Sequence, residues 1–448
     1  MSNRFLEIPV SNKTSDGRMS FRKGIANLIF QVPAINSTLI PSSVRISGKI
    51  RCYLNDDKDA PSQELTTDAR LGVYGAFQSL TTRSIKHQQT IENIRHYGHF
   101  LSNFLPLSTS SADALNNWSL TAGIEPAYHL NRNNADGNDS GGGLLRAVDR
   151  DFCLPLPCGL FNGTSDIPLN ESMLGGLEVV IALASDSQFL FAIDGDEASV
   201  NDAWYEFDDL KLVCEVRDYT PDELSQLMRK SASGFTYQSI SSYYDVINSQ
   251  NANIVFNLGL SKVRSIFSSF IPSDFLNNYK HNSYATIMPS NTDGQQASVR
   301  KITWTKGGAL YPKMMELNTN IRESPTTLLQ DPVVIKDYVD SVSDFSMSDR
   351  LQMNLNTTNR DIIMKNSTTA SENKQLQYTK VANGGVVYGC GIRYDALGGQ
   401  GVDFSNPGSQ FGMNLELDLT TNSPQSVFIF VNSEINVVFN QNGVQVIQ

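Results

Sequence analysis

The middle of this 448-residue chain changes from a strand pattern to a helix pattern within residues 203–230. Apolar residues recur at every second position in the first part of this segment, at Leu210, Leu212, Cys214 and Val216. A period of two predicts a strand with one buried face and one mostly polar face. An apolar stripe with helical spacing follows, at Leu224, Leu227 and Met228. The small and polar residues 231–234 then let a second unit begin, so we predict that this segment joins two β domains.

The predicted helix has the sequence features of a capped N-terminus. Thr220 supplies a capping hydroxyl, Pro221 fits the first helical position, and Asp222 places an acid in the first turn. Glu223 lies three residues after Thr220 and completes a capping box, in which its carboxylate binds the backbone of the cap residue. We therefore assign Thr220 and Glu223 as the cap of a linker helix.

The length of the chain predicts more than one domain, because a single hydrophobic core rarely serves so many residues. A hydrophobic content of 40% with 18% charged residues is typical of a folded protein. We predict an extended N-terminal arm over residues 1–25, which orders by packing on another surface. The rest is divided into a first β domain (26–219), the linker helix (220–235) and a second β domain (236–448).

Both halves contain strand-like runs, predicted at residues 28–32, 44–54, 151–156, 177–183, 254–258, 411–419 and 427–439. Helical spacing is found at residues 90–105 and 332–342, and the apolar run 263–271 fits a helix better than a strand. Residues 131–143 and 346–374 are rich in polar residues and predict long loops. Each half also ends with a strand, a polar loop and another strand. Two antiparallel β sandwiches with few short helices fit this pattern best.

The charge of the chain argues against nucleic-acid wrapping. There are 35 basic and 46 acidic residues, a net charge of −11, and no dense run of Lys and Arg. The one small basic cluster comprises Arg18, Arg22 and Lys23. A polyanion contact and a solvated arm both fit this cluster, and we favour the arm.

The sequence predicts folding in a reducing compartment. No apolar run approaches the ~20 residues that span a bilayer, and the N-terminus lacks a signal-peptide core. The five cysteines are scattered, which is typical of buried thiols rather than of a disulfide framework.

Motifs for catalysis or for cofactors were not found. The chain has no phosphate-binding loop, dinucleotide-binding fingerprint, HExxH or GxSxG sequence. His96 and His99, with His87 nearby, have a spacing compatible with a shared metal, but no Cys or acidic ligand completes the set, and we favour polar-face histidines near a subunit contact. Residues 194–197 resemble the start of a calcium loop that lacks its glycine and its final glutamate. We expect no catalytic residue, cofactor or metal.

Four segments carry a resemblance to a known family: YEFDDLKLVCEVRDY (205–219), TPDELSQLMRK (220–230), WTKGGALYPKMMEL (304–317) and SVFIFVNSEINVVF (426–439). With two tandem sandwiches and long polar loops, the chain resembles the double jelly-roll major capsid proteins of icosahedral double-stranded DNA viruses. This family includes adenovirus hexon and tectivirus coat proteins, and the nearest members in style come from virophages and polinton-like viruses. The resemblance covers residues 26–448.

The resemblance implies two tandem eight-stranded antiparallel jelly rolls joined by a short helix. It also implies a homotrimer whose six jelly rolls form a pseudo-hexameric capsomer in the virion, synthesised in the host cytoplasm. Its partners would be neighbouring capsomers, penton proteins and minor capsid proteins, with no specific nucleic acid. The N-terminal arm would face inward, and its contact with an inner membrane stays open.

Other classes of protein share this composition. A receptor- or glycan-binding fibre or spike would carry an aromatic or Asp/Asn-rich site on one domain. A minor capsid protein would have one jelly roll, without a return to the same strand pattern in its second half. An enzyme on tandem β domains needs convergent acid and base groups, which the sequence does not supply.

Overall fold

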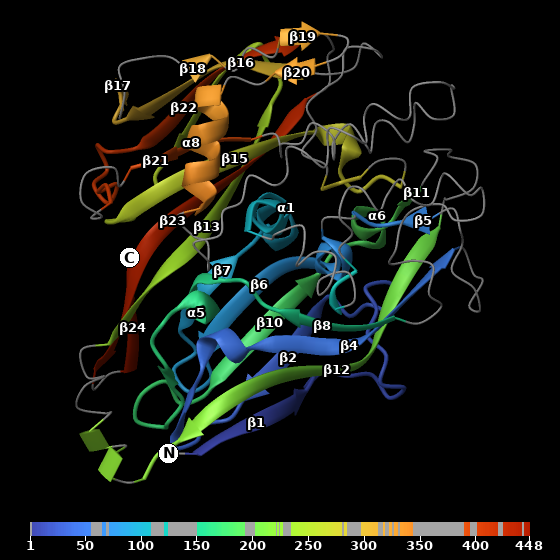
Figure 1. Ribbon diagram of the computed structural model, residues 1–448, viewed down its shortest axis with the longest axis vertical. Coiled ribbons are helices and arrows are strands. Elements are labelled where there is room, and N and C mark those ends of the chain that lie inside the picture. Colours follow the sequence, from blue (N-terminus) through green and yellow to red (C-terminus); the bar gives the residue numbers. More distant parts are fainter. Residues whose placement is uncertain are drawn as a thin grey trace.

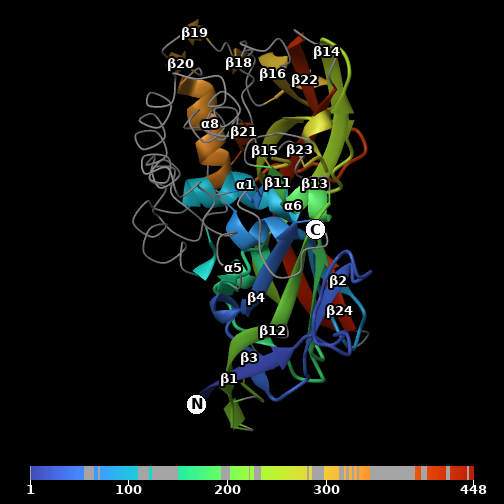
Figure 2. The same ribbon diagram turned by 90° about the vertical axis from the view of Figure 1, so that its right-hand side faces the viewer.

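The computed structural model describes residues 2–54, 65–68, 71–108, 121–123, 150–192, 202–220, 222–223, 225–226, 234–279, 282–284, 297–311, 317–318, 322–324, 327–329, 332–343, 389–394, 401–419, 424–440 and 443–448. These residues form two β sandwiches, one above the other in the view of Figure 1. Figure 2 shows the same two units from the side, with α1 (Tyr97–Ser108) between them. The predicted mainly-β class with few helices is confirmed.

The first sandwich consists of a six-stranded and a four-stranded sheet, and all recorded strand pairs are antiparallel. The larger sheet contains β1 (Ser2–Pro9), β3 (Ser37–Leu39), β4 (Arg45–Leu54), β8 (Arg150–Pro155), β9 (Ile167–Pro168) and β12 (Ala203–Asp218). The smaller sheet has the order β2 (Asn27–Val32), β10 (Leu177–Leu183), β6 (Phe77–Ser84) and β7 (Thr90–Ile94). A two-stranded pair, β5 (Leu65–Thr66) and β11 (Phe191–Ala192), lies outside both sheets.

The second sandwich consists of two five-stranded sheets. One contains β13 (Phe235–Ile247), β15 (Val263–Pro272), β21 (Gly389–Arg393), β23 (Gln425–Asn440) and β24 (Gly443–Ile447). The other contains β14 (Asn251–Phe256), β16 (Ala297–Lys306), β17 (Ala309–Leu310), β18 (Leu317–Asn318) and β22 (Phe411–Leu419). The strands β19 (Arg322–Ser324) and β20 (Thr327–Leu329) form a separate pair.

Short helices fill the gaps between strands: α5 (Gly159–Asn162), α6 (Asp186–Phe189) and α8 (Pro332–Ser343), with the 3-10 turns η1 (Pro41–Ser43), η2 (Gly72–Ala76) and η4 (Ser273–Phe275). The predicted Pro-started helix is confirmed as α8. The predicted loops 131–143 and 346–374 lie outside the described residues.

The strand predicted in the middle of the chain is confirmed as β12, and it is longer than the alternating segment 210–216. β12 runs over 16 residues, and its second half alternates buried and partly exposed side chains. The next strand, β13, belongs to a different sheet from β12, so no sheet continues across the junction. Two sandwiches rather than one continuous sheet are therefore present.

The N-terminal segment lies against the edge of β12. β1 pairs with β12 from Ser2, opposite Asp218, to Pro9, opposite Lys211. Met19 then exchanges two backbone hydrogen bonds with Phe207 further along β12. β4 pairs with one edge of β12, and residues 2–9 pair with the other edge. The division of the chain that separates residues 1–25 as an extended arm stays a prediction.

Two predictions are corrected. Residues 263–271 form strand β15 rather than a helix. Both faces of β15 are buried, because Ile266 and Phe270 pack in the core of the second sandwich whereas Phe267 and Ile271 pack towards the first. Burial on both faces removes the period of two from the sequence.

The predicted helix 90–105 is in fact a strand followed by a helix. β7 ends at Ile94, and α1 begins at Tyr97. A strand and a helix that are both buried give one continuous apolar pattern, which hides the change between them.

The five cysteines are free thiols. Cys52, Cys158, Cys214 and Cys390 are buried, and Cys153 is partly exposed. The prediction of buried thiols therefore holds for four of them. Among the described residues, no helix is long and apolar enough to cross a membrane.

Candidate functional site

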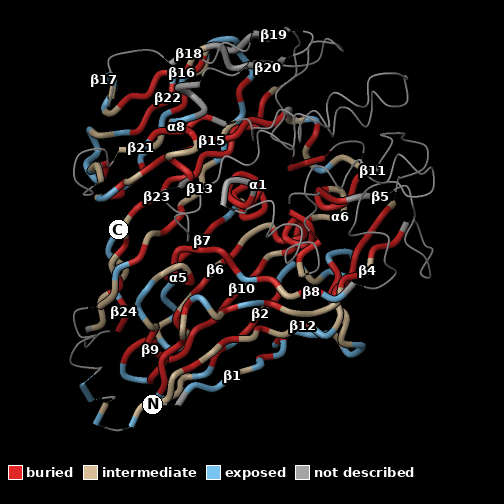
Figure 3. The backbone as a smooth tube through the Cα atoms, viewed as in Figure 1, coloured by how far each residue is buried: buried red, intermediate tan, exposed pale blue. Residues whose placement is uncertain are grey.

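The two sandwiches share a buried contact, which we call the inter-domain seam. It brings residues 91–103 of the first sandwich against β13, β15, β23 and residues 283–284 of the second. In Figure 3 the backbone of α1, between the two halves, is coloured as buried. This contact fixes how the two sandwiches lie relative to each other.

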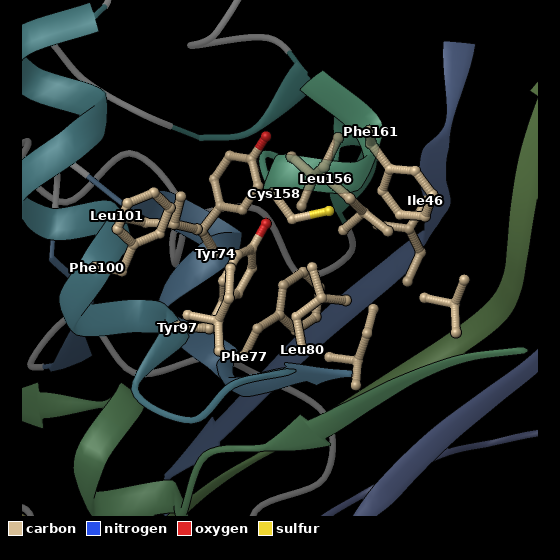
Figure 4. Packing of buried hydrophobic residues seen from close by; sticks show 14 of the residues in the cluster. Ile46, Tyr74, Phe77, Leu80, Tyr97, Phe100, Leu101, Leu156, Cys158 and Phe161 are labelled. Atoms are coloured by element: carbon tan, nitrogen blue, oxygen red, sulfur yellow. The ribbon is translucent and has the colours of Figure 1, made fainter. Parts of the chain in front are cut away.

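Helix α1 is buried on every side, as far as Leu105. A helix buried all round needs apolar or satisfied side chains in all directions. Phe100 lies 5.8 Å from Phe430 and 6.3 Å from Phe267, measured between ring centroids, so it faces the second sandwich. Figure 4 shows that Tyr97 lies near Tyr74 and the thiol of Cys158, within the first sandwich.

Strand β23 serves two cores at once. Val427, Ile429 and Val431 lie in the core of the second sandwich. Phe428 and Phe430, on the opposite face, belong to the apolar cluster of the first sandwich and α1. The lower ends of β13 and β23, with β24, also pack in that cluster through Tyr237, Ile435, Val437 and Val444. One sheet of the second sandwich therefore continues past its own core and covers part of the first (Figure 1).

Hydrogen bonds accompany this apolar contact along β13. The Tyr237 hydroxyl donates to the carbonyl of Ile91 at 2.8 Å. The backbone N–H of Arg95 donates to the hydroxyl of Ser242 at 2.9 Å. Apolar burial alone would let the two sandwiches slide along each other. These hydrogen bonds fix the position of β13 along residues 91–95, because each bond forms only at one alignment.

The Glu92 carboxylate is the centre of the polar part of the seam. Its side chain is almost fully buried and accepts four hydrogen bonds, from Gly159 N (3.0 Å), Leu160 N (2.9 Å), Ser239 Oγ (2.9 Å) and Ile240 N (3.2 Å). Two of these donors come from each sandwich. Burial raises the pKa of Glu92, and the four hydrogen bonds oppose that shift. The carboxyl group therefore holds both sandwiches through a single residue.

Gly159 lets the two sandwiches come this close. A Cβ atom at this position would lie 1.8 Å from the carbonyl oxygen of Gln238 and 2.7 Å from Oε1 of Glu92. Gln238 belongs to β13, so the glycine hydrogen atom is in contact with the second sandwich. Any larger residue would push the strand away from α5.

Asn103 forms a second polar contact across the seam. Its Nδ2 donates to Ser269 Oγ on β15 at 3.2 Å, and its Oδ1 accepts from the Tyr338 hydroxyl on α8 at 2.6 Å. The amide is fully buried, and both ends of it are occupied. Helix α1 is thus bound to a strand and to a helix of the second sandwich.

The histidines of the sequence prediction lie in this seam. His99 is buried and stacks on Phe428, with ring centroids 3.8 Å apart, and His96 lies 5.1 Å from the same ring. No group of three His, Cys, Asp or Glu side chains suited to a metal ion is present among the described residues. The interpretation as polar-face histidines is wrong for His99, because it is enclosed between the sandwiches. His87 is the exception: it lies outside the contact with Phe428, its Nε2 is 3.1 Å from the carbonyl oxygen of Met173, and its ring lies beside Gly443 of β24, where an added Cβ would be 2.7 Å from Nδ1.

The basic cluster near the N-terminus is neutralised within the chain. Arg18 and Lys23 lie 3.0 and 3.3 Å from the Glu206 carboxylate, whose side chain is 1% exposed. Arg22 pairs with Asp202 at 2.8 Å. These side chains bind the N-terminal segment to β12 and leave no concentrated positive surface in this region.

Thr220 and Glu223 are joined by reciprocal hydrogen bonds. The backbone N–H of Thr220 donates to Glu223 Oε2 at 3.0 Å, and the backbone N–H of Glu223 lies 3.4 Å from Thr220 Oγ1. Residues 222–223 and 225–226 are helical, and most of the predicted helix beyond them lies outside the described residues. The contacts between the sandwiches lie in the seam, so the capping role of this pair stays a local prediction.

A pocket of about 500 Å³ opens on the larger sheet of the first sandwich. Its lining includes Phe5, which is 63% exposed, and Arg45, whose guanidinium lies 5.8 Å from the Phe5 ring. The volume is in the range of small-molecule sites, but the lining lacks the buried, convergent polar groups of such sites. We therefore centre the functional interpretation on the seam.

The sequence analysis did not find Glu92, Gly159 or Asn103. A carboxylate between the apolar residues Ile91 and Ile94 was a detectable signal, because a buried carboxylate next to core residues is stable only where donors surround it. Gly159 and Asn103 carry no such signal, since their partners in the second sandwich, Gln238 for Gly159 and Ser269 and Tyr338 for Asn103, lie far away in the chain.

Replacing Gly159 with Ala should weaken the seam. The added methyl group meets backbone atoms that cannot move without shifting β13, so we expect the free energy of unfolding to fall by about 2–3 kcal/mol, measured by urea denaturation. Gly163→Ala is the matched control, because its added Cβ meets nothing closer than 3.4 Å. Equal stability of the two variants would contradict the close contact at Gly159.

Replacing Thr220 with Ala should remove the helix cap and lower the free energy of unfolding by about 1 kcal/mol. Thr220→Ser keeps the hydroxyl and should retain most of the stability. Both sandwiches should still fold in either variant, because Thr220 does not belong to the seam. Equal losses in the two variants, measured by the same denaturation, would show that the hydroxyl does not cap a helix.

No protein-family model and no curated protein matches this sequence. Solved structures do match, over nearly the whole chain. VP54 of PBCV-1, fitted into a reconstruction of the virophage Sputnik, has a TM-score of 0.55 at 10% identity and covers 100% of this chain and 97% of its own. The Faustovirus major capsid protein has a TM-score of 0.52 at 7% identity, covering 98% and 90%. The Sputnik virophage structure has a TM-score of 0.50 at 12% identity, covering 100% and 88%. The chain therefore has the double jelly-roll fold of these capsid proteins.

Proposed function

We propose that this chain is a major capsid protein whose role is structural rather than enzymatic. The observation that carries the proposal is the likeness to viral capsid proteins across both sandwiches and the seam between them, with nearly complete coverage of each chain. A likeness limited to one sandwich would fit many unrelated β proteins, whereas the tandem arrangement is far more specific.

The physical character of the molecule supports a shell role. The N-terminal segment covers one edge of β12, and the two sandwiches share a buried seam, so the chain is a rigid block. A coat protein distributes its affinity over broad contacts between rigid blocks. We propose that three copies form a trimer with six jelly rolls, a pseudo-hexameric capsomer, and that capsomers pack side by side in an icosahedral virion.

The partners in this proposal are other copies of the chain, neighbouring capsomers, and penton and minor capsid proteins. The net charge of −11 and the internal pairing of Arg18, Arg22 and Lys23 support a shell that does not condense nucleic acid itself. We propose that the N-terminal segment, which pairs with β12 through residues 2–9, faces inward in the shell.

The purified protein should form a stable trimer with a mass of about 150 kDa, three times the 49.5 kDa chain. Light scattering during size-exclusion chromatography measures this mass, and negative-stain micrographs should show hexagonal outlines. A monomer that binds glycans on an array would contradict the capsomer and favour a fibre or spike protein.

A further inference from the structure

We propose that the inter-domain seam is an acid-sensitive latch, in which the buried pair His96 and His99 holds the two sandwiches together when both rings are neutral and releases them when both rings are protonated. The proposal concerns the isolated chain and does not require that it builds a shell. It follows from the geometry of the two rings, from their place at a helix N-terminus and from the groups around them.

The hydrogen bonding of His99 fixes its neutral form. Its Nε2 lies 3.1 Å from the carbonyl oxygen of Ser283, and a carbonyl oxygen only accepts, so Nε2 carries the proton. Its Nδ1 is buried and has no hydrogen-bond partner among the described residues. Protonation would place a new donor on Nδ1 inside a closed contact with Phe428, without an acceptor to receive it.

Protonation of His96, which is partly exposed, would also create a donor without an acceptor. Its Nδ1 is also buried without a partner, and its ring lies among Tyr244, Phe428 and His99, with centroids 5.7, 5.1 and 6.2 Å away. Burial is the main cause that lowers the pKa of His96, and the charge of Arg95 lowers it further, to about 4. Burial is also the main cause that lowers the pKa of His99, and the charge of His96 lowers it further, to about 3. The hydrogen bond to Ser283 raises this pKa but is the weakest of the three effects.

The position of both rings at the start of α1 adds to this effect. His96 directly precedes Tyr97, the first residue of the helix, and His99 lies in the first turn. The free N–H groups of a helix N-terminus carry partial positive charge, which disfavours a cation there. A protonated pair would also repel itself and the neighbouring Arg95.

Among the residues that the structure describes, no carboxylate forms an ion pair with His96 or His99. β23 presents Phe428, and the segment after η4 presents Ser283 and Tyr284. Besides the two histidines, the described charged and tyrosine residues on the elements packed around α1 are Asp68, Tyr74, Arg83, Glu92, Arg95, Tyr97, Tyr237, Tyr243, Tyr244, Asp245, Arg264, Asp274, Tyr284, Lys336, Asp337, Tyr338, Asp340 and Glu434. Several of the carboxylates bind other groups: Glu92 binds four donors, Asp68 binds Asn282, Asp245 binds Val246 N and Asp340 binds Lys336.

The direction of the pH effect follows from proton linkage. Both histidines have a lower pKa in the closed seam than in an opened one, so the opened state takes up protons as the pH falls below about 6.5. The two histidines therefore do not weaken the closed seam at neutral pH. The closed seam loses stability as the pH falls from about 6.5 towards the pKa values of His96 and His99 in the closed seam, about 4 and about 3. Glu92 acts in the opposite direction, because burial raises its pKa and its protonation favours the closed seam.

Thiol labelling of the full-length chain tests the latch. Cys158 is fully buried beside Gly159 in the seam, whereas Cys390 is buried in the core of the second sandwich, so the pair separates opening of the seam from global unfolding. A neutral pyridyl disulfide, which reacts under acid conditions, is applied between about pH 7.5 and about pH 4.5, and the labelled peptides are quantified by mass spectrometry. We expect Cys158 to become reactive with acid while Cys390 stays protected, with an opening constant that rises by up to about tenfold per pH unit for each histidine.

The double variant His96→Gln, His99→Gln should lose this acid dependence, because glutamine does not titrate. His87→Gln should keep it, since His87 lies at the β6–β7 turn, outside the contact with Phe428. If the double variant does not fold, His96→Gln alone should reduce the acid dependence by about one proton. The latch is refuted if Cys158 stays protected at the lowest pH, if both cysteines become reactive together, or if the histidine variants keep the full acid response.

Discussion

The burial of α1 between the two sandwiches is the constraint on which the rest of the structure depends. The helix has no solvent-facing side from Tyr97 to Leu105, so it is stable only while both sandwiches cover it. β23 is constrained in the same way, because Phe428 and Phe430 face the helix whereas Ile429 and Val431 face the second core. Neither sandwich can therefore move away without exposing a large apolar surface.

Close burial of this kind requires that the polar groups within it are satisfied. Glu92 and Asn103 meet that requirement with donors and acceptors from both sandwiches. His96 and His99 do not meet it fully, since each has an unpartnered ring nitrogen. Glu92 and Asn103 therefore fix the relative position of the two sandwiches, whereas protonation of His96 and His99 costs free energy in the closed seam.

Period and capping signals allowed much of the fold to be predicted. β12, β22 and α8 lie where strict alternation or a Pro-started stripe placed them. β15 was missed because burial on both faces leaves no alternation, and α1 was merged with β7 for a similar reason. The seam itself was not predictable in detail, because Glu92 and Gly159 obtain their roles from partners on strands far away in the chain.

Calorimetry tests the central claim, that the seam makes one cooperative unit of two sandwiches. At neutral pH and fixed protein concentration, thermal unfolding should give a single transition whose calorimetric enthalpy equals its van't Hoff enthalpy for the folded unit. Two resolved transitions, one for each sandwich, would contradict the claim, because they would show that either sandwich is stable when α1 and the outer face of β23 are uncovered.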